Sequence, residues 1–200
     1  DQKIAVALYD VSGHGVSAAL TGSLIHNQLK TLLEEEQQPA TILDQLNKLI
    51  IHNVGQTGMF ITILLAILDM DQKTMTVTNA GHPDLLVWRN ETSALEGLRS
   101  HIPPVGMTLH LLGSDNESTV DFKTGDRIIF YTDGFLEAAD HEGKMVEKKG
   151  LHAMIHENIH ADTKGFIEGM FSSLARHHQG KPDDDVTLLV VDINEKAPPV

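Results

Sequence analysis

Two patterns of apolar residues recur along the chain and divide it into predicted strands and helices. Continuous β-branched and apolar runs predict buried strands, whereas apolar residues at every third or fourth position predict helices. In segment 16–36, apolar residues recur at helical spacing, including Val16, Leu20, Leu24 and Leu32. The predicted strands are 3–9, 59–69, 75–80, 85–88, 118–122, 127–132 and 186–193, and the predicted helices are 16–36, 41–54, 135–140, 147–158 and 163–178.

Short polar turns between these strands predict how they pair. MDQKT joins 59–69 to 75–80, and KTGD joins 118–122 to 127–132, so each pair is expected to form a hairpin. Residues 89–118 are expected to be irregular. Strands in hairpins, with helices in two blocks, favour an α+β fold of two mostly antiparallel sheets with helices outside, rather than βαβ units.

The length of 200 residues suits one domain, expected over 1–193, with 194–200 as a flexible tail. The chain has no starting Met, so it is expected to be a piece of a longer protein, and its domain is expected to lack its N-terminal strand or strands. No export signal is visible at its start. The longest apolar run, 59–68, is too short to span a bilayer, so no membrane contact is evident and a cytoplasmic location is expected.

The net charge of −13 argues against binding to nucleic acid or to an acidic membrane. The absence of cysteine excludes disulfides, thiolate metal sites and a cysteine nucleophile. Most of the acidic excess is interpreted as a solubility feature. Some of these carboxylates, however, are in a pattern that suggests a cation site.

Acidic residues stand at the ends of three predicted strands. Asp10 and Asp133 follow their strands, whereas Asp184 and Asp185 precede the last one. If the last strand runs antiparallel to the other two, these carboxylates gather at one edge of the sheet. Oxygen ligands favour a hard cation such as Mg²⁺ or Mn²⁺. Taken singly, each residue could instead be a turn residue, a helix cap or part of a solvated loop.

Five blocks of the sequence resemble, in this order, the metal-dependent protein phosphatases (PPM, protein phosphatase 2C-like). They are DVSGHGVSAAL (10–20), NAGHPDLLV (79–87), PVGM (104–107), YTDGFLEA (131–138) and DDVTLLVV (184–191). The likeness is to the bacterial branch typified by the sporulation phosphatase SpoIIE and by sigma-factor regulators. It implies a four-layer αββα sandwich that binds two Mn²⁺ or Mg²⁺ ions. It also implies an enzyme that hydrolyses phosphoserine or phosphothreonine on a protein.

The resemblance also implies roles for individual residues. Asp10 matches the aspartate that bridges both metals, and the carbonyl of Val11 the adjacent backbone ligand. Asp133 and Asp184 match further metal carboxylates, with Asp185 beside the latter, and Asp183 is expected to be solvated. The remaining residues of the expected site, which shape it, are Gly13, Gly15 and Gly134.

Two histidines lie within the matching blocks. His14 is a candidate general acid for the leaving seryl oxygen, although the register differs from that of eukaryotic relatives. The alternative is a histidine packed between two glycines at a helix start. His82, like Asn79, is interpreted as hydrogen-bonding the turn of its block and not as catalytic.

One departure from the family concerns a further metal aspartate in an upstream Gly-Asp-aromatic block, which this sequence does not contain. Asp1 is not assigned as its replacement. If the full protein also lacks that ligand, one of the two metals would be weakly bound or absent. The alternative function is then a weak or inactive phosphatase-like domain that binds a partner as an adaptor.

The partners implied are a phosphorylated anti-anti-sigma-type protein as substrate and an upstream sensor or receiver domain. A rival signal is HENIH (156–160), which matches the zinc-protease pattern H-E-x-x-H, with His152 one turn earlier. A third zinc ligand is not evident downstream, and the match is interpreted as a surface helix.

Overall fold

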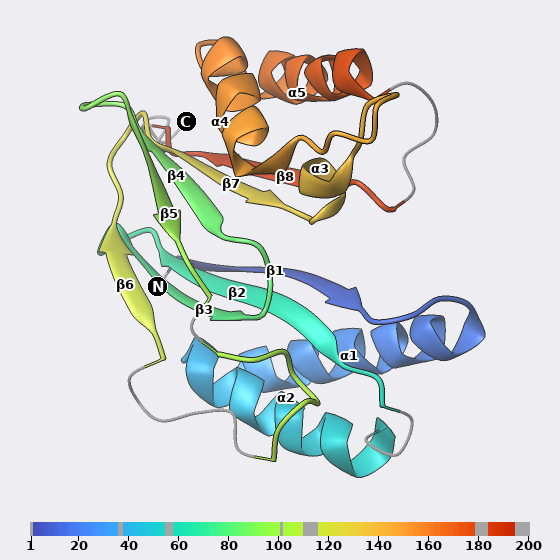
Figure 1. The fold of residues 1–200 in the computed structure, drawn as a ribbon. Helices are drawn as coiled ribbons and strands as arrows, with labels where there is room; N and C mark the ends of the chain where they lie inside the picture. The colour runs from blue at the N-terminus through green and yellow to red at the C-terminus, as the bar shows by residue number, and fades with distance from the viewer. Residues whose placement is uncertain are drawn as a thin grey trace. The chain divides into compact units, whose positions relative to one another are not determined.

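The structure is a computed structural model that describes residues 2–35, 38–54, 58–100, 102–109, 116–178 and 184–194 (Figure 1). The chain divides into two compact units, each with a four-stranded sheet. One comprises Asp1–Asp84 and Leu98–Phe122, and the other comprises Leu85–Gly97 and Lys123–Val200. The predicted α+β class, with mostly antiparallel sheets and flanking helices, is confirmed.

The first unit has the strand order β1-β2-β3-β6. The pairs β1–β2, β2–β3 and β3–β6 are antiparallel. Because β2 and β3 pair directly, the first predicted hairpin is confirmed. The elements of this unit are β1 (Lys3–Val11), α1 (Val16–Glu35), α2 (Pro39–Val54), β2 (Ile61–Asp69), β3 (Thr74–Ala80) and β6 (Ser118–Asp121).

The two helices of this unit cover one face of its sheet, as Figure 1 shows. Their buried residues follow the helical period: Ile25 and Leu29 on α1 are four residues apart, and so are Leu46 and Ile50 on α2. They pack against alternate residues of β2, which face the same side of a strand, and so form the core of the unit.

The second unit has the strand order β5-β4-β7-β8. The pairs β4–β7 and β7–β8 are antiparallel. Three helices lie over one face of this sheet (Figure 1) and bury a second core around Trp88, Phe135 and Phe166. The elements are β4 (Leu85–Arg89), β5 (Ala94–Leu98), β7 (Arg127–Tyr131), α3 (Gly134–Glu137), α4 (Glu147–Asn158), α5 (Thr163–His177) and β8 (Leu188–Asp192).

The second predicted hairpin is wrong. β6 pairs with β3, whereas β7 pairs with β4 and β8 in the other sheet. The turn 123–126 is held by Asp126, whose carboxylate accepts the backbone N–H of Lys123 and of Asn90, each at 3.1 Å. The turn is therefore bound to the end of β4 and not closed as a hairpin.

The expected irregular stretch 89–118 also contains strand β5, which the sequence analysis missed. Its sequence, ALEGL, is half exposed and lacks the apolar run that marked the other strands. Asp1, Asp183 and most of the expected tail, 195–200, lie outside the described residues. In the part of the chain that the structure describes, no helix is long and apolar enough to cross a membrane.

Candidate functional site

The carboxylates of the second unit meet at one end of its sheet. β7 and β8 are antiparallel, with Tyr131 opposite Leu188. Asp133 lies two residues beyond the end of β7, and Asp184 and Asp185 lie four and three residues before the start of β8, so all three are at the same end of these strands. The sequence argument required the last strand, β8, to run antiparallel to the others, and it does so relative to β7.

Hydrogen bonds from a side chain to the backbone, and a close backbone contact, join the Asp133 segment to the Asp185 segment. The hydroxyl of Thr132 donates to the carbonyl of Asp185 at 3.0 Å and accepts the N–H of Thr187 at 2.9 Å. A Cβ atom added at Gly134 would lie 2.5 Å from the carbonyl oxygen of Asp185. Only glycine permits this approach, so Gly134 has the local shaping role that the sequence suggested.

The charges at this end are not balanced by the described side chains. Among the described residues, no Lys, Arg or His forms an ion pair with Asp133, Asp184 or Asp185. Asp133 stands at the N-cap of α3, yet its carboxylate accepts no capping hydrogen bond. One oxygen of Asp184 accepts the N–H of Asp185 at 2.8 Å. Carboxylate oxygens are the type of ligand that hard divalent ions prefer.

Asp10 belongs to the other sheet. It lies near the end of β1, opposite Thr62, and its side chain is exposed. The sequence argument placed Asp10 on the same sheet edge as Asp133 and Asp184, and this is wrong because β1 pairs with β2 in the first unit. Within either unit, the described residues contain no group of three or more His, Asp or Glu side chains that could hold a metal ion.

A glycine-rich loop follows Asp10 and Val11 and leads into α1. Its start is fixed to the residue just before β2, because Ser12 donates its N–H to Phe60 O and accepts the Phe60 N–H through Oγ, at 2.9 and 2.8 Å. Gly13 and Gly15 have φ of 92° and 85°, which side chains rarely adopt. His14, between them, is exposed, so the alternative of a packed histidine is not what the structure shows.

Asn79 and His82 shape the turn after β3. The side chain of Asn79 accepts the N–H of His82 at 2.9 Å and donates to Pro83 O at 3.0 Å, as expected for a turn residue. The buried His82 has Nδ1 3.2 Å from the hydroxyl of Thr62. Thr62 stands opposite Asp10, so His82 supports the strand that carries it. The sequence analysis missed Thr62, for which no local motif gives a signal.

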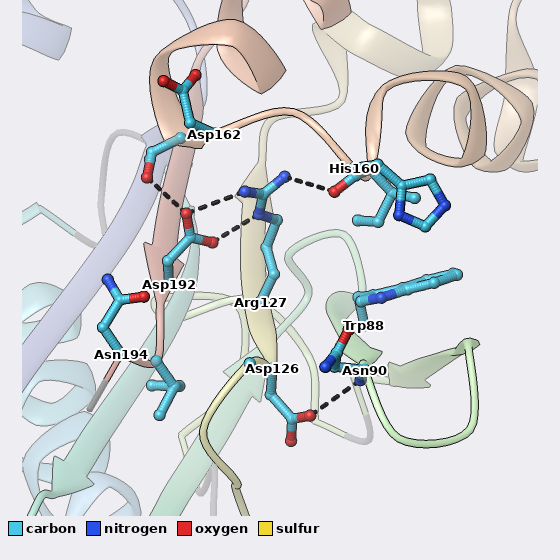
Figure 2. Close-up of a pocket in the computed structure, with 12 residues that line it drawn as sticks. Trp88, Asn90, Asp126, Arg127, His160, Asp162, Asp192 and Asn194 are labelled. Carbon is cyan, nitrogen blue, oxygen red and sulfur yellow. Dashed lines mark hydrogen bonds and ion pairs between the residues drawn. The ribbon is translucent and has the colours of Figure 1, made fainter.

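A pocket of about 410 Å³ lies in the second unit, at the opposite end of β7 and β8 (Figure 2). Figure 2 shows the Arg127 guanidinium facing the Asp192 carboxylate, and the two form hydrogen bonds at 2.5 and 2.9 Å. Arg127 also donates to the carbonyls of Ile159 and Ala161. These charges are paired with one another, so we assign this end of the sheet a structural role.

The histidines of HENIH do not form a zinc site. His156 lies on α4 with its ring edge-on to Trp88, at 5.2 Å between centroids. α4 ends at Asn158, so His160 lies beyond the helix and lines the pocket instead. The zinc-protease pattern needs both histidines on one helical face, which this arrangement does not provide.

The sequence matches the family described as stage II sporulation protein E (SpoIIE) over residues 1–194. It is 27% identical over 192 residues to phosphoserine phosphatase RsbU of Bacillus subtilis (strain 168). The aligned region covers 95% of this chain and 56% of that protein. The chain therefore spans about half the length of this relative.

Solved structures share the fold. The SiaA-PP2C domain of Pseudomonas aeruginosa matches with a TM-score of 0.82 and 18% identity, over 96% of this chain and 80% of that one. The catalytic domain of the serine/threonine protein phosphatase PstP, solved with two manganese ions, matches with a TM-score of 0.67 and 15% identity, over 96% and 88% of the two chains. At these identities the likeness establishes the fold alone.

Proposed function

The chain belongs to the stage II sporulation protein E (SpoIIE) family, and we propose that it is a metal-dependent protein phosphatase acting on phosphoserine or phosphothreonine. The observation that carries this proposal is the position of Asp133, Asp184 and Asp185 at the same end of the β7–β8 pair, where no described Lys, Arg or His forms an ion pair with them. Its support comes from the family match and from the phosphoserine phosphatase named among the relatives.

We propose that Asp10, Asp133 and Asp184 bind two Mn²⁺ or Mg²⁺ ions, with Asp185 beside them and the carbonyl of Val11 as a further ligand. Bound ions of this kind lower the pKa of a water and neutralise charge on a phosphoryl group. A manganese-bound phosphatase of the same fold supports the choice of metal.

The chain's own residues have separate tasks in this proposal. The aspartates hold and orient the ions, and the left-handed glycines Gly13 and Gly15 let the backbone near Asp10 approach them closely. His14 would donate a proton to the seryl or threonyl oxygen that leaves, a task for which its exposed side chain is accessible to substrate. No covalent intermediate on the protein is required.

The substrate and regulation are the finer parts of the proposal. We propose a phosphorylated anti-anti-sigma-type regulator as substrate and an upstream sensor or receiver domain as the control element, by analogy with the family. If phosphate release is absent while a phosphoprotein still binds, the adaptor alternative replaces the enzyme.

The experiment is an assay of phosphate release by the full-length protein from phosphoserine and phosphothreonine peptides and from candidate regulators. We expect release with Mn²⁺ or Mg²⁺ and none with a chelator. Asp133→Asn should reduce the rate by more than about a hundredfold, since loss of a metal ligand should exceed the 10–100-fold cost of losing a residue that only supports one.

The melting temperature of Asp133→Asn should stay at the wild-type value, because the Asp133 carboxylate makes no capping hydrogen bond. Asp44→Asn serves as the matched control, since Asp44 forms a surface pair with Lys48 on α2 and should leave the rate unchanged. An Asp133→Asn protein that keeps its activity would contradict the assignment.

A further inference from the structure

The hydroxyl of Thr132 sits at the junction between the two acidic segments of the second unit. Thr132 directly precedes Asp133 and is only 7% exposed. Its backbone N–H donates to Thr187 O at 3.2 Å, one step beyond the last β7–β8 pair, Tyr131 and Leu188. The strand ladder therefore continues through Thr132 up to the residue that carries the carboxylate.

The side chain of Thr132 extends this ladder to Asp185. Its Oγ1 accepts the Thr187 N–H at 2.9 Å and donates its own proton to Asp185 O at 3.0 Å, so both functions of the hydroxyl are used. The carbonyl of Asp185 is also packed closely against Gly134. The Asp184–Asp185 turn is thus fixed to the Asp133 segment by hydrogen bonds between the Thr132 hydroxyl and main-chain atoms of Asp185 and Thr187.

This arrangement uses main-chain atoms of the Asp184–Asp185 turn and leaves the carboxylates of Asp133, Asp184 and Asp185 available to bind a cation. Adjacent carboxylates repel one another, and none of the three has an ion-pair partner among the described residues. An apolar residue at position 132 would leave the Thr187 N–H and the Asp185 carbonyl without this partner. The turn that carries Asp184 and Asp185 would then be free to move away from Asp133.

We propose that Thr132 is a positioning residue, whose hydroxyl holds the Asp184–Asp185 turn beside the Asp133 segment, so that these carboxylates stay at the same end of the strands for a divalent ion to bind. This inference rests on the proposed function, because it gives a role to a residue that supports the same metal site. Thr132 touches neither substrate nor metal in this proposal, and it acts through the backbone of Asp185.

The test compares Thr132→Val, which keeps the shape and removes the hydroxyl, with Thr132→Ser, which keeps the hydroxyl. Mn²⁺ binding to the full-length protein is measured by calorimetry, and the Mn²⁺ dependence of phosphate release is measured in parallel. We expect Thr132→Val to weaken Mn²⁺ binding about tenfold, the lower end of the range for residues that support metal ligands. Saturating Mn²⁺ should restore most of the rate, and Thr132→Ser should bind Mn²⁺ within about twofold of wild type.

Thr78→Val is the matched control. Thr78 is a buried strand threonine, 1% exposed on β3, and in the described part of the chain its hydroxyl has no hydrogen-bond partner. The same substitution there should leave Mn²⁺ binding unchanged. Hydrogen exchange of the Thr187 amide gives a reading that does not depend on metal, and we expect faster exchange in Thr132→Val alone.

Measurements on the wild-type protein distinguish the failure of this inference from the failure of the proposed function. A wild-type protein that binds Mn²⁺ and releases phosphate, with Thr132→Val unchanged in Mn²⁺ affinity, would overturn the inference and leave the proposed function standing. A wild-type protein that neither binds Mn²⁺ nor releases phosphate would overturn the proposed function, and this inference with it.

Discussion

The two ends of the β7–β8 strand pair both carry charged side chains, but these side chains are paired at one end and not at the other. At one end, Asp192 is paired with Arg127 and also accepts a hydrogen bond from Thr163. At the other end, Asp133 and Asp185 have no ion-pair partner among the described residues. The charges at the Arg127–Asp192 end stabilise the fold, whereas the carboxylates at the Asp133–Asp185 end remain available to bind a ligand.

The paired end is also the more enclosed one. The side chain of Arg127 is 8% exposed and that of Asp192 is 17% exposed. The Arg127 guanidinium also lies 4.4 Å from the centre of the Phe166 ring. Charges this well covered are costly unless they are paired, so the pairing has a clear energetic reason. Asp184 and Asp185 are exposed, and water can screen them until a cation binds.

Arg127→Met should give the largest change in stability and so the strongest test of this contrast. It leaves Asp192 partly buried without its cation, which should lower the free energy of unfolding by about 3 kcal/mol. The measurement is urea-induced unfolding. Mn²⁺ binding by the folded protein should be unaffected, since the acidic end lies about 17 Å away along a five-residue strand.

The control for Arg127→Met is the double variant Arg127→Met with Asp192→Leu. Removing both charges should recover much of the lost stability, because replacing a buried ion pair by apolar residues is often nearly neutral. If Arg127→Met unfolds at the wild-type urea concentration, or if it weakens Mn²⁺ binding, then the division between a structural end and a ligand end is wrong.

Gly134→Ala should have the next largest effect, now at the acidic end. The added Cβ would lie 2.5 Å from the Asp185 carbonyl oxygen, and a backbone atom cannot move aside as a flexible side chain can. We expect a loss of about 2 kcal/mol in unfolding free energy, typical of overpacking, together with weaker Mn²⁺ binding. Both would be measured on the same protein, by urea unfolding and by calorimetry.

Gly22→Ala is the matched control for Gly134→Ala. Gly22 lies inside α1, and a Cβ there would meet the Val11 side chain at an ordinary 3.9 Å. Alanine is a better helix former than glycine, so Gly22→Ala should stabilise the protein by up to about 1 kcal/mol. If Gly134→Ala is also neutral or stabilising, the close contact with Asp185 does not shape the acidic end.

The strand pairing shows what sequence reasoning reached and where it failed. The turn after β2 was predicted correctly, and Asp69 accepts the N–H groups of Asp71 and Gln72 within it. KTGD is as good a turn signal, yet it leads to a different sheet. The difference is not local: Asp126 binds Asn90, which is 36 residues earlier in the chain.

For the candidate site, only the placement of residues at strand ends can be compared with the sequence. The strand-end positions of Asp133, Asp184 and Asp185 followed from the sequence, because an antiparallel pair brings such ends together. The sheet that holds Asp10 did not follow, because pairing partners cannot be read from the strand itself. Thr132 was missed as well, since its two partners are more than 50 residues away and no local pattern identifies them.

The pH dependence of stability should give the smallest effect, and it tests the pairing of Asp192 at the paired end. Burial alone would raise the pKa of Asp192, but hydrogen bonds from Arg127 and Thr163 outweigh it and hold the pKa below the ordinary value of 3.8. A carboxylate with a lowered pKa in the folded state stabilises the protein above its unfolded pKa. That stabilisation is lost as the pH falls from about 4 through the folded pKa.

Asp192→Asn isolates this contribution from that of other carboxylates, such as Asp140, whose pKa is also lowered, mainly by a backbone hydrogen bond from Lys144. Urea midpoints of wild type and Asp192→Asn are compared at pH 7 and at pH 3. We expect wild type to be the more stable at pH 7 and the difference to shrink at pH 3. A difference that stays constant would mean that Arg127 does not hold Asp192 in its charged form. The contrast between a paired end and an unpaired end of these strands would then lose its electrostatic basis.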